Sequence, residues 1–299
     1  MKTKFLSILT IGVALFVGAC NEDNESSKGK ISVSITDAPI DDANVEAVYI
    51  SINSVEVNGP DGWVTLDEFD EPEKIDLLSY QDGNAYFLTE ETINTGTYTE
   101  VRLILDIQER NGNVQANPGC YIEYKDGSVQ PLFVPSGGQS GYKAKGEFTI
   151  ADGGVTAVTL DFDVRKAVVE AGNSGKFILK PTVRLVEDAD VAMIRGTFDD
   201  EDADYTSVVV FAYENGTFTE AEIAAPADED VRFPNAVTSD AVEADGSFTL
   251  AFMNAGTYDL YFAAFDENGD FVELIGTSPD VTLSAGLITE LELTLTLLD

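Results

Sequence analysis

The chain contains 299 residues, with 54 acidic and 17 basic side chains, a net charge of −37 and no histidine. A surface this negative repels nucleic-acid phosphates, so we exclude nucleic acid as a partner. The absence of histidine removes the commonest general base and the commonest metal ligand, which argues against histidine-dependent hydrolases and against zinc sites.

The first residues have the layout of a secretory signal peptide. Two lysines precede an apolar run that ends at Val17, and this run is shorter than the about 20 residues that a membrane-spanning helix needs. It leads into a Val-Gly-Ala-Cys sequence that resembles a bacterial lipobox. We predict that residues 1–19 are a signal peptide and that Cys20 is lipidated, with ordinary cleavage after Ala19 as the alternative. Acyl chains such as palmitate would then attach the protein to a membrane.

Residues 20–29 are acidic, contain serine and glycine, and show no apolar periodicity, which is typical of a flexible tether. Acidic residues directly behind a lipidated cysteine also resemble the surface-export signals of Bacteroidota lipoproteins. We therefore expect an outer-membrane lipoprotein that faces outward, with a periplasmic orientation as the alternative.

Apolar and polar residues alternate through most of the remaining chain. Ile31, Val33 and Ile35 begin the pattern, and short alternating runs continue to the C-terminus between turn signals. Alternation with a period of two predicts β-strands that bury one face. We predict an all-β protein with two antiparallel β-sandwich domains, at residues 30–188 and 189–299.

Four ordered motifs in the first predicted domain resemble the bacterial family catalogued as domain of unknown function 4382. The motifs are Ser34–Pro39, Val134–Gly141, Leu160–Arg165 and Leu179–Leu185. The family has no assigned activity, so the resemblance implies a common domain without implying a reaction.

The second predicted domain resembles the carboxypeptidase-regulatory or transthyretin-like β-sandwich. The resemblance is carried by Ile194–Phe198, Ala244–Leu250 and Ala255–Leu260. It implies a supporting or binding role, since such domains do not usually catalyse. The acidic segment 224–244 is longer than this pattern expects.

Asp161 and Asp163 lie two residues apart on a predicted strand, so we expect both on its polar face with Arg165 next in the row. Two carboxylates about 7 Å apart can serve a glycoside hydrolase. Neighbours on one strand, however, diverge into water instead of flanking a bond. A charge ladder or a support for the Pro135–Gly141 loop is therefore the favoured interpretation, and we assign no catalytic residue.

Calcium is the metal that the acidic residues bring into question. Asp37 follows the first strand in a Thr-Asp-Ala-Pro sequence, where its carboxylate most simply accepts N–H groups from the turn fixed by Pro39. Alternatively, Asp37, Asp41 and Asp42 supply oxygen ligands for a calcium ion. Asp266 also opens a spacing found in calcium loops, but the later ligands are missing and a hairpin turn is favoured. Apart from calcium we expect no cofactor.

Two features are candidates for ligand binding. Trp63 is the only tryptophan and serves either as part of an aromatic sugar platform or as a core anchor. The loop at 135–141 places Ser136, Gly137 and Gln139 where they can contact a ligand, unless it is only a flexible strand connection. Cys120, the one thiol left once Cys20 is lipidated, is expected to be an apolar filler.

We therefore expect a non-catalytic surface lipoprotein that displays a binding or adhesion module for a carbohydrate or an envelope protein. The membrane is its second partner, through the lipid on Cys20. Two alternatives stay open: a glycoside hydrolase that uses carboxylates, and a structural spacer stabilised by calcium.

Overall fold

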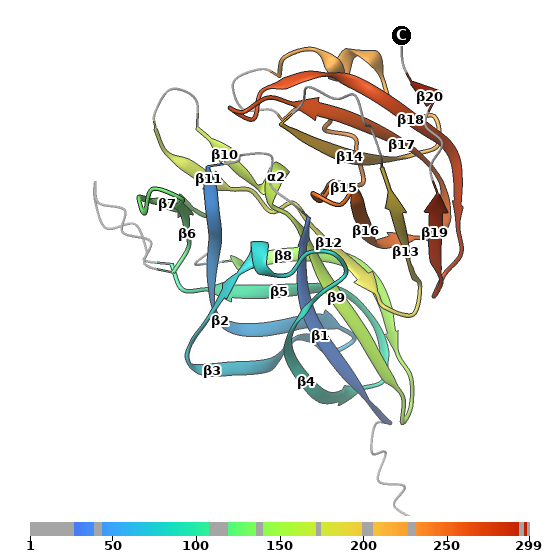
Figure 1. Ribbon diagram of the computed structural model, residues 1–299. Helices are drawn as coiled ribbons and strands as arrows, with labels where there is room; N and C mark the ends of the chain where they lie inside the picture. Colours follow the sequence, from blue (N-terminus) through green and yellow to red (C-terminus); the bar gives the residue numbers. More distant parts are fainter. Residues whose placement is uncertain are drawn as a thin grey trace, which may run out of the picture.

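The computed structural model describes residues 27–38, 44–107, 119–135, 140–171, 175–198, 206–226, 231–292 and 296–297. Figure 1 shows two groups of strands, formed by the N-terminal part of the chain below and by the C-terminal part above. Nearly all regular elements are strands, so the expected all-β class is confirmed. None of the helices in the described ranges is long and apolar enough to cross a membrane.

The N-terminal part forms one twelve-stranded sheet. Its strand order is β10-β11-β7-β6-β2-β5-β8-β12-β9-β1-β4, with β3 paired to β2 beside this path. Its strands are β1 (Lys28–Ala38), β2 (Val45–Gly59), β3 (Gly62–Asp76), β4 (Tyr86–Asn94), β5 (Gly96–Leu105), β6 (Tyr121–Tyr124), β7 (Val129–Phe133), β8 (Tyr142–Ile150), β9 (Val155–Asp163), β10 (Val168–Glu170), β11 (Phe177–Leu179) and β12 (Val183–Glu187). The short helices η1 (Leu77–Ser79) and α2 (Val164–Ala167) connect strands of this sheet.

The long strand β2 is where the sheet branches. Its first half pairs with β6 and its second half with β5, while β3 follows its other edge. The alternating apolar residues point to one shared core: Ile31, Val33 and Ile35 of β1 are fully buried in the same cluster as Val55 of β2 and Leu160 of β9. Burial of one face is the reason that the period of two recurs along several strands of this part of the chain.

Parallel pairing is the feature of this sheet that alternation does not reveal. β1 runs parallel to β9 over nine paired residues, from Lys30 opposite Val155 to Ala38 opposite Asp163. The expectation of purely antiparallel sheets was therefore wrong in this respect, because period two is the same for both pairing types. β1 also begins at Lys28, so the last two residues of the predicted tether already belong to the sheet.

The C-terminal part forms two further sheets, ordered β16-β13-β19 and β15-β14-β17-β18-β20. Their strands are β13 (Val191–Thr197), β14 (Ser207–Glu214), β15 (Thr238–Ala241), β16 (Ser247–Asn254), β17 (Gly256–Phe265), β18 (Phe271–Leu283), β19 (Ile288–Glu292) and β20 (Thr296–Leu297), with η3 (Glu220–Ile223) after β14. One core cluster unites Ile194 and Leu250 of the first sheet with Phe262 of the second, so the two sheets form a sandwich.

Candidate functional site

A ligand-sized groove lies on the first sheet beside β8 and β12. Its volume is about 380 Å³, and its lining includes Pro135, Tyr142, Lys143, Lys145, Pro181 and Val183. We call this hollow the basic groove. The two lysines share one face of β8 because the strand alternates: Ala144, which lies between them, is buried in the core, and Lys143 and Lys145 point to the other face.

The cross-strand neighbours of the two lysines carry both signs of charge. Arg102 of β5 lies opposite Lys143, and Lys145 lies between Glu100 of β5 and Arg184 of β12. Both arginines bind carboxylates, Arg102 that of Glu56 and Arg184 that of Asp161. Lys143 and Lys145, in contrast, form no ion pair with any residue in the described part of the chain. Two ammonium groups therefore remain available to an anion at this place.

Trp63 does not line the groove, but its ring lies close to two of these cations. The guanidinium carbon of Arg102 lies 4.0 Å from the centre of the indole ring, and Nζ of Lys143 lies 5.2 Å from it. The ring is partly exposed and does not sit in the core. Because an aromatic face attracts cations, Trp63 positions the Lys143 ammonium without neutralising its charge.

The glycine-rich loop lies at the same groove. Its described residues Pro135, Ser140 and Gly141 line the hollow. The predicted ligand contacts Ser136, Gly137 and Gln139 lie outside the described residues. The structure thus brings both described ends of the loop to the groove and places Trp63 next to Lys143, while sequence reasoning missed the two lysines. Their signal in the sequence was Lys-Ala-Lys on a strand, which places two cations on one face of a very acidic chain.

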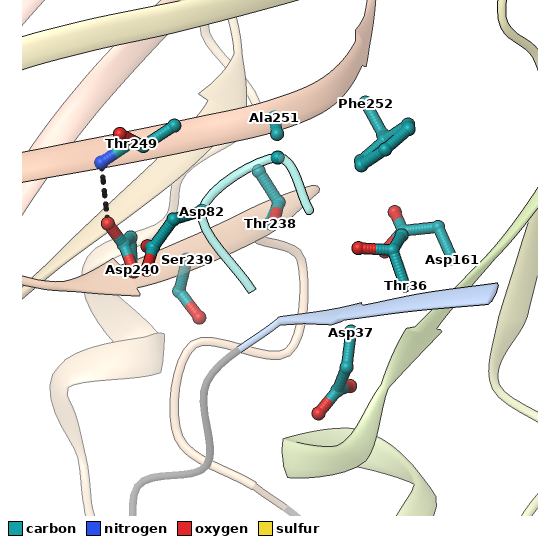
Figure 2. A pocket seen from close by; sticks show the side chains of 11 residues that line it. Thr36, Asp37, Asp82, Asp161, Thr238, Ser239, Asp240, Thr249, Ala251 and Phe252 are labelled. Atoms are coloured by element: carbon teal, nitrogen blue, oxygen red, sulfur yellow. Dashed lines mark hydrogen bonds between the residues drawn. The ribbon is translucent and has the colours of Figure 1, made fainter. Parts of the chain in front are cut away.

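A second hollow lies between the two parts of the chain and is lined by acids. Figure 2 shows Asp161 and Thr36 on one side of it, with Asp82 and Asp240 on the other. We call it the junction cavity. It holds about 10 Å³, which is room for a single water molecule and not for a sugar.

The carboxylate of Asp240 is almost fully buried at the junction cavity. It accepts a hydrogen bond from the Thr249 amide at 2.6 Å. Burial raises the pKa of Asp240 to about 7, and the negative charge of Asp82 adds to the effect. Burial also raises the pKa of Asp161 to about 6, although the neighbouring guanidinium of Arg184 acts in the opposite direction. Both groups titrate close to neutral pH in the folded protein.

The expected charge row of Asp161, Asp163 and Arg165 was wrong. β9 ends at Asp163, whose carboxylate caps α2 by accepting the Lys166 amide at 3.1 Å and pairs with the Lys166 ammonium at 2.9 Å. Asp161 is buried instead of facing water. The chain turns into α2 at this point, so Arg165 leaves the strand direction altogether.

Arg165 and Lys166 bind the C-terminal part of the chain, which sequence reasoning missed. Arg165 is buried and donates to the carbonyl oxygens of Arg232 at 2.5 Å and Phe233 at 3.3 Å. Lys166 donates to the carbonyl of Ala236 at 2.5 Å. These acceptors lie in the long segment before β15, so its unexpected length supplies the surface on which α2 docks.

The turn that follows Asp37 lies outside the described residues, so the expected hydrogen bonds from that turn stay a prediction. Within the described residues, Asp37 contacts a distant part of the chain. Its Oδ1 accepts the amide of Val164, the first residue of α2, at 3.1 Å. The parallel pairing of β1 with β9 brings these two distant residues together, and Figure 2 shows the carboxylate pointing toward α2. Asp41 and Asp42 lie outside the described residues, and no group of three potential metal ligands occurs among those that are described.

Two smaller expectations are confirmed. Cys120 is fully buried, and burial raises the pKa of its thiol to about 11, as befits an apolar filler. The predicted turn at Asn268-Gly269 joins β17 to β18, with Asp266 accepting the amides of Asn268 and Asp270 at 2.9 Å each. Cys20 lies outside the described residues.

Comparison with known proteins gives one family. The model described as Domain of unknown function (DUF4382) matches residues 28–181. No curated protein matches the chain.

Solved structures give only distant likenesses. The chain is similar to the Bacillus anthracis TIE protein, with 12% identity, coverage of 90% of this chain and 34% of that one, and a TM-score of 0.21. It is also similar to a leucine-rich repeat protein from Bacteroides thetaiotaomicron VPI-5482, with 12% identity, coverage of 90% of this chain and 27% of that one, and a TM-score of 0.19. For GBS52, the minor pilin of Streptococcus agalactiae, the identity is 10%, the coverage is 90% of this chain and 96% of that one, and the TM-score is 0.21. The chain spans about a third of the length of the first protein and about a quarter of the second. TM-scores this low do not establish a common fold.

Proposed function

This chain belongs to the family Domain of unknown function (DUF4382), and we propose that it is a non-catalytic binding module of the adhesion type. In this proposal the ligand occupies the basic groove. Acyl chains on Cys20 hold the module at the outer membrane, facing outward.

The basic groove is the observation that carries this proposal. Its volume of about 380 Å³ falls within the range of about 300–1,000 Å³ that is usual for ligand pockets. Its floor is fixed before any ligand arrives: the Tyr142 hydroxyl donates to the Lys180 carbonyl at 2.6 Å, and the Tyr142 ring stacks on Phe162 with centres 5.3 Å apart. A rigid floor lowers the entropy lost on binding.

The arrangement of the acids supports binding over catalysis. Asp161 pairs with Arg184 and Asp163 with Lys166, so neither carboxylate faces an open cleft. The junction cavity beside Asp161 is too small for a glycosidic bond and its flanking sugars. The groove, in turn, offers lysines but no acid among its lining residues, which leaves no carboxylate pair for acid-base chemistry there.

The experiment is to fill the groove without changing its charge. Val183→Trp places a bulky side chain in the lining, and Val155→Trp, at an exposed residue of β9, is the matched control. We expect the protein and the Val155→Trp control to bind at least one member of a panel of glycans and purified envelope proteins, and Val183→Trp to lose that binding.

Two readouts make the result decisive. Circular dichroism checks that Val183→Trp is folded, and Pro181→Trp, at another lining residue, serves if it is not. Hydrolysis of a glycan by the protein, or equal binding by the filled and unfilled grooves, would contradict the proposal.

A further inference from the structure

We infer that the basic groove binds the carboxylate of an acidic sugar at the free end of a glycan. This inference rests on the proposed function and names the chemical class of its ligand. It starts from the two lysines of β8.

The case for a negatively charged ligand is electrostatic. Acidic side chains outnumber basic ones by 54 to 17. Lys143 and Lys145 lie on one face of β8, and although Glu100 is the cross-strand neighbour of Lys145, neither lysine forms an ion pair with a described residue. Alternate residues of a strand stand about 7 Å apart, so both ammonium groups can donate to the two oxygens of one bound carboxylate.

The apolar walls of the groove favour a sugar as the ligand. Pro135, Pro181 and Val183 present apolar surface on either side of the lysines. The C–H faces of a pyranose ring pack on such surface, while its carboxylate reaches the charged end. A volume of about 380 Å³ admits one or two sugar rings and not a folded peptide segment.

The net charge of the protein favours the free end of a glycan over its interior. At −37 the protein repels a long polyanion along its whole length, whereas the attraction of the two lysines is felt within about one Debye length, roughly 10 Å. A single terminal carboxylate gains this local attraction and brings little repulsion with it.

The test titrates the full mature protein with defined probes, followed by NMR and calorimetry in low salt. Glucuronic acid and N-acetylneuraminic acid are the acidic sugars, glucose is the neutral sugar, acetate is the simple anion and polygalacturonate is the polyanion. We expect the acidic sugars to bind, glucose and acetate to bind at least tenfold more weakly, and Lys143→Gln with Lys145→Gln to weaken the acidic sugars at least tenfold. Raising the salt concentration should weaken them as well.

The matched control is the double variant Lys28→Gln with Lys125→Gln, which removes two exposed lysines away from the groove and should bind normally. Equal binding of glucose, equal binding of acetate, or tighter binding of polygalacturonate per carboxylate would each overturn the inference. If the acidic sugars do not bind, but a neutral ligand binds and Val183→Trp abolishes that binding, the inference is wrong and the proposed function stands. If neither kind of ligand binds, both fall.

Discussion

Among single residues, buried carboxylates have the largest expected effect on the stability of this acidic chain. Asp240 is the clearest case, because the residue is only 3% exposed and is affected by the further acids Asp82 and Glu243. One hydrogen bond from the Thr249 amide opposes the cost of burial. The folded protein therefore holds a proton on Asp240 at pH values where the unfolded chain has released it.

We predict that the protein becomes less stable as the pH rises, because Asp240 then loses this proton and leaves a buried negative charge. The pKa of Asp240 is about 7 when folded against an ordinary value of 3.8, so its cost is absent below about pH 4 and grows until the pH exceeds 7. Asp240→Asn should raise the free energy of unfolding at pH 8 by up to about 4 kcal/mol and change it little at pH 4. Urea unfolding at both pH values measures this difference.

The control for this prediction is Asp152→Asn, in an exposed turn, which should leave the pH dependence as it is in the wild type. An Asp240→Asn protein whose stability gained nothing at pH 8 would show that the carboxylate is not strained by its burial.

At the scale of elements, tight turns join the strands, and some of them need glycine for two separate reasons. Gly246 precedes β16 with φ of +84°, a conformation that side chains disfavour. A Cβ there would also lie 2.4 Å from the carbonyl oxygen of Phe198. Gly216 follows β14 with φ of +73° but has open space around it. Comparing alanine substitutions at Gly246 and Gly216 therefore distinguishes the cost of backbone strain from the cost of a steric clash.

We predict that Gly246→Ala destabilises the protein more than Gly216→Ala. Gly216→Ala should cost about 1–2 kcal/mol, since only the left-handed conformation opposes it. Gly246→Ala should cost about 1–3 kcal/mol more, because the backbone carbonyl of Phe198 must move away from the new methyl group. Chemical denaturation of the two variants gives the comparison, and equal losses would mean that the turn before β16 shifts freely.

At the scale of the whole molecule, the docking of α2 decides how the two parts of the chain act on each other. Arg165 enters the C-terminal part, donates to two carbonyl oxygens and lies with its guanidinium carbon 5.1 Å from the ring centre of Phe211. The turn at Gly83 adds a second contact, because a Cβ there would lie 2.4 Å from Cε of Met193. We expect contacts of this kind to couple the unfolding of the two parts of the chain.

We predict that Arg165→Met uncouples them. The mature protein should melt in one cooperative transition, and the variant should melt in two, with the first shifted down because the carbonyls of Arg232 and Phe233 lose their donor. Differential scanning calorimetry resolves the transitions. Lys125→Met, which removes an exposed cation elsewhere, should melt like the wild type, and an Arg165→Met protein that did the same would refute the coupling.

Much of the fold could be predicted because burial of one strand face leaves a local mark. The alternation of Ile31, Val33 and Ile35 identified a strand, and Asn268-Gly269 identified a hairpin, since both depend on residues that are neighbours in the chain. The pairing of β1 with β9 could not be predicted, because parallel and antiparallel strands carry the same alternation.

Composition and a local period were enough to establish the all-β class and the excess of negative charge. Only the tertiary structure decided which charges meet. In the fold, Asp161 pairs with Arg184 and Asp163 pairs with Lys166, while Arg165 donates to distant carbonyls. Lys143 and Lys145 line a groove instead. The physical reason is that charge partners and hollows are created by residues far apart in the chain, whose contact depends on strand order and register.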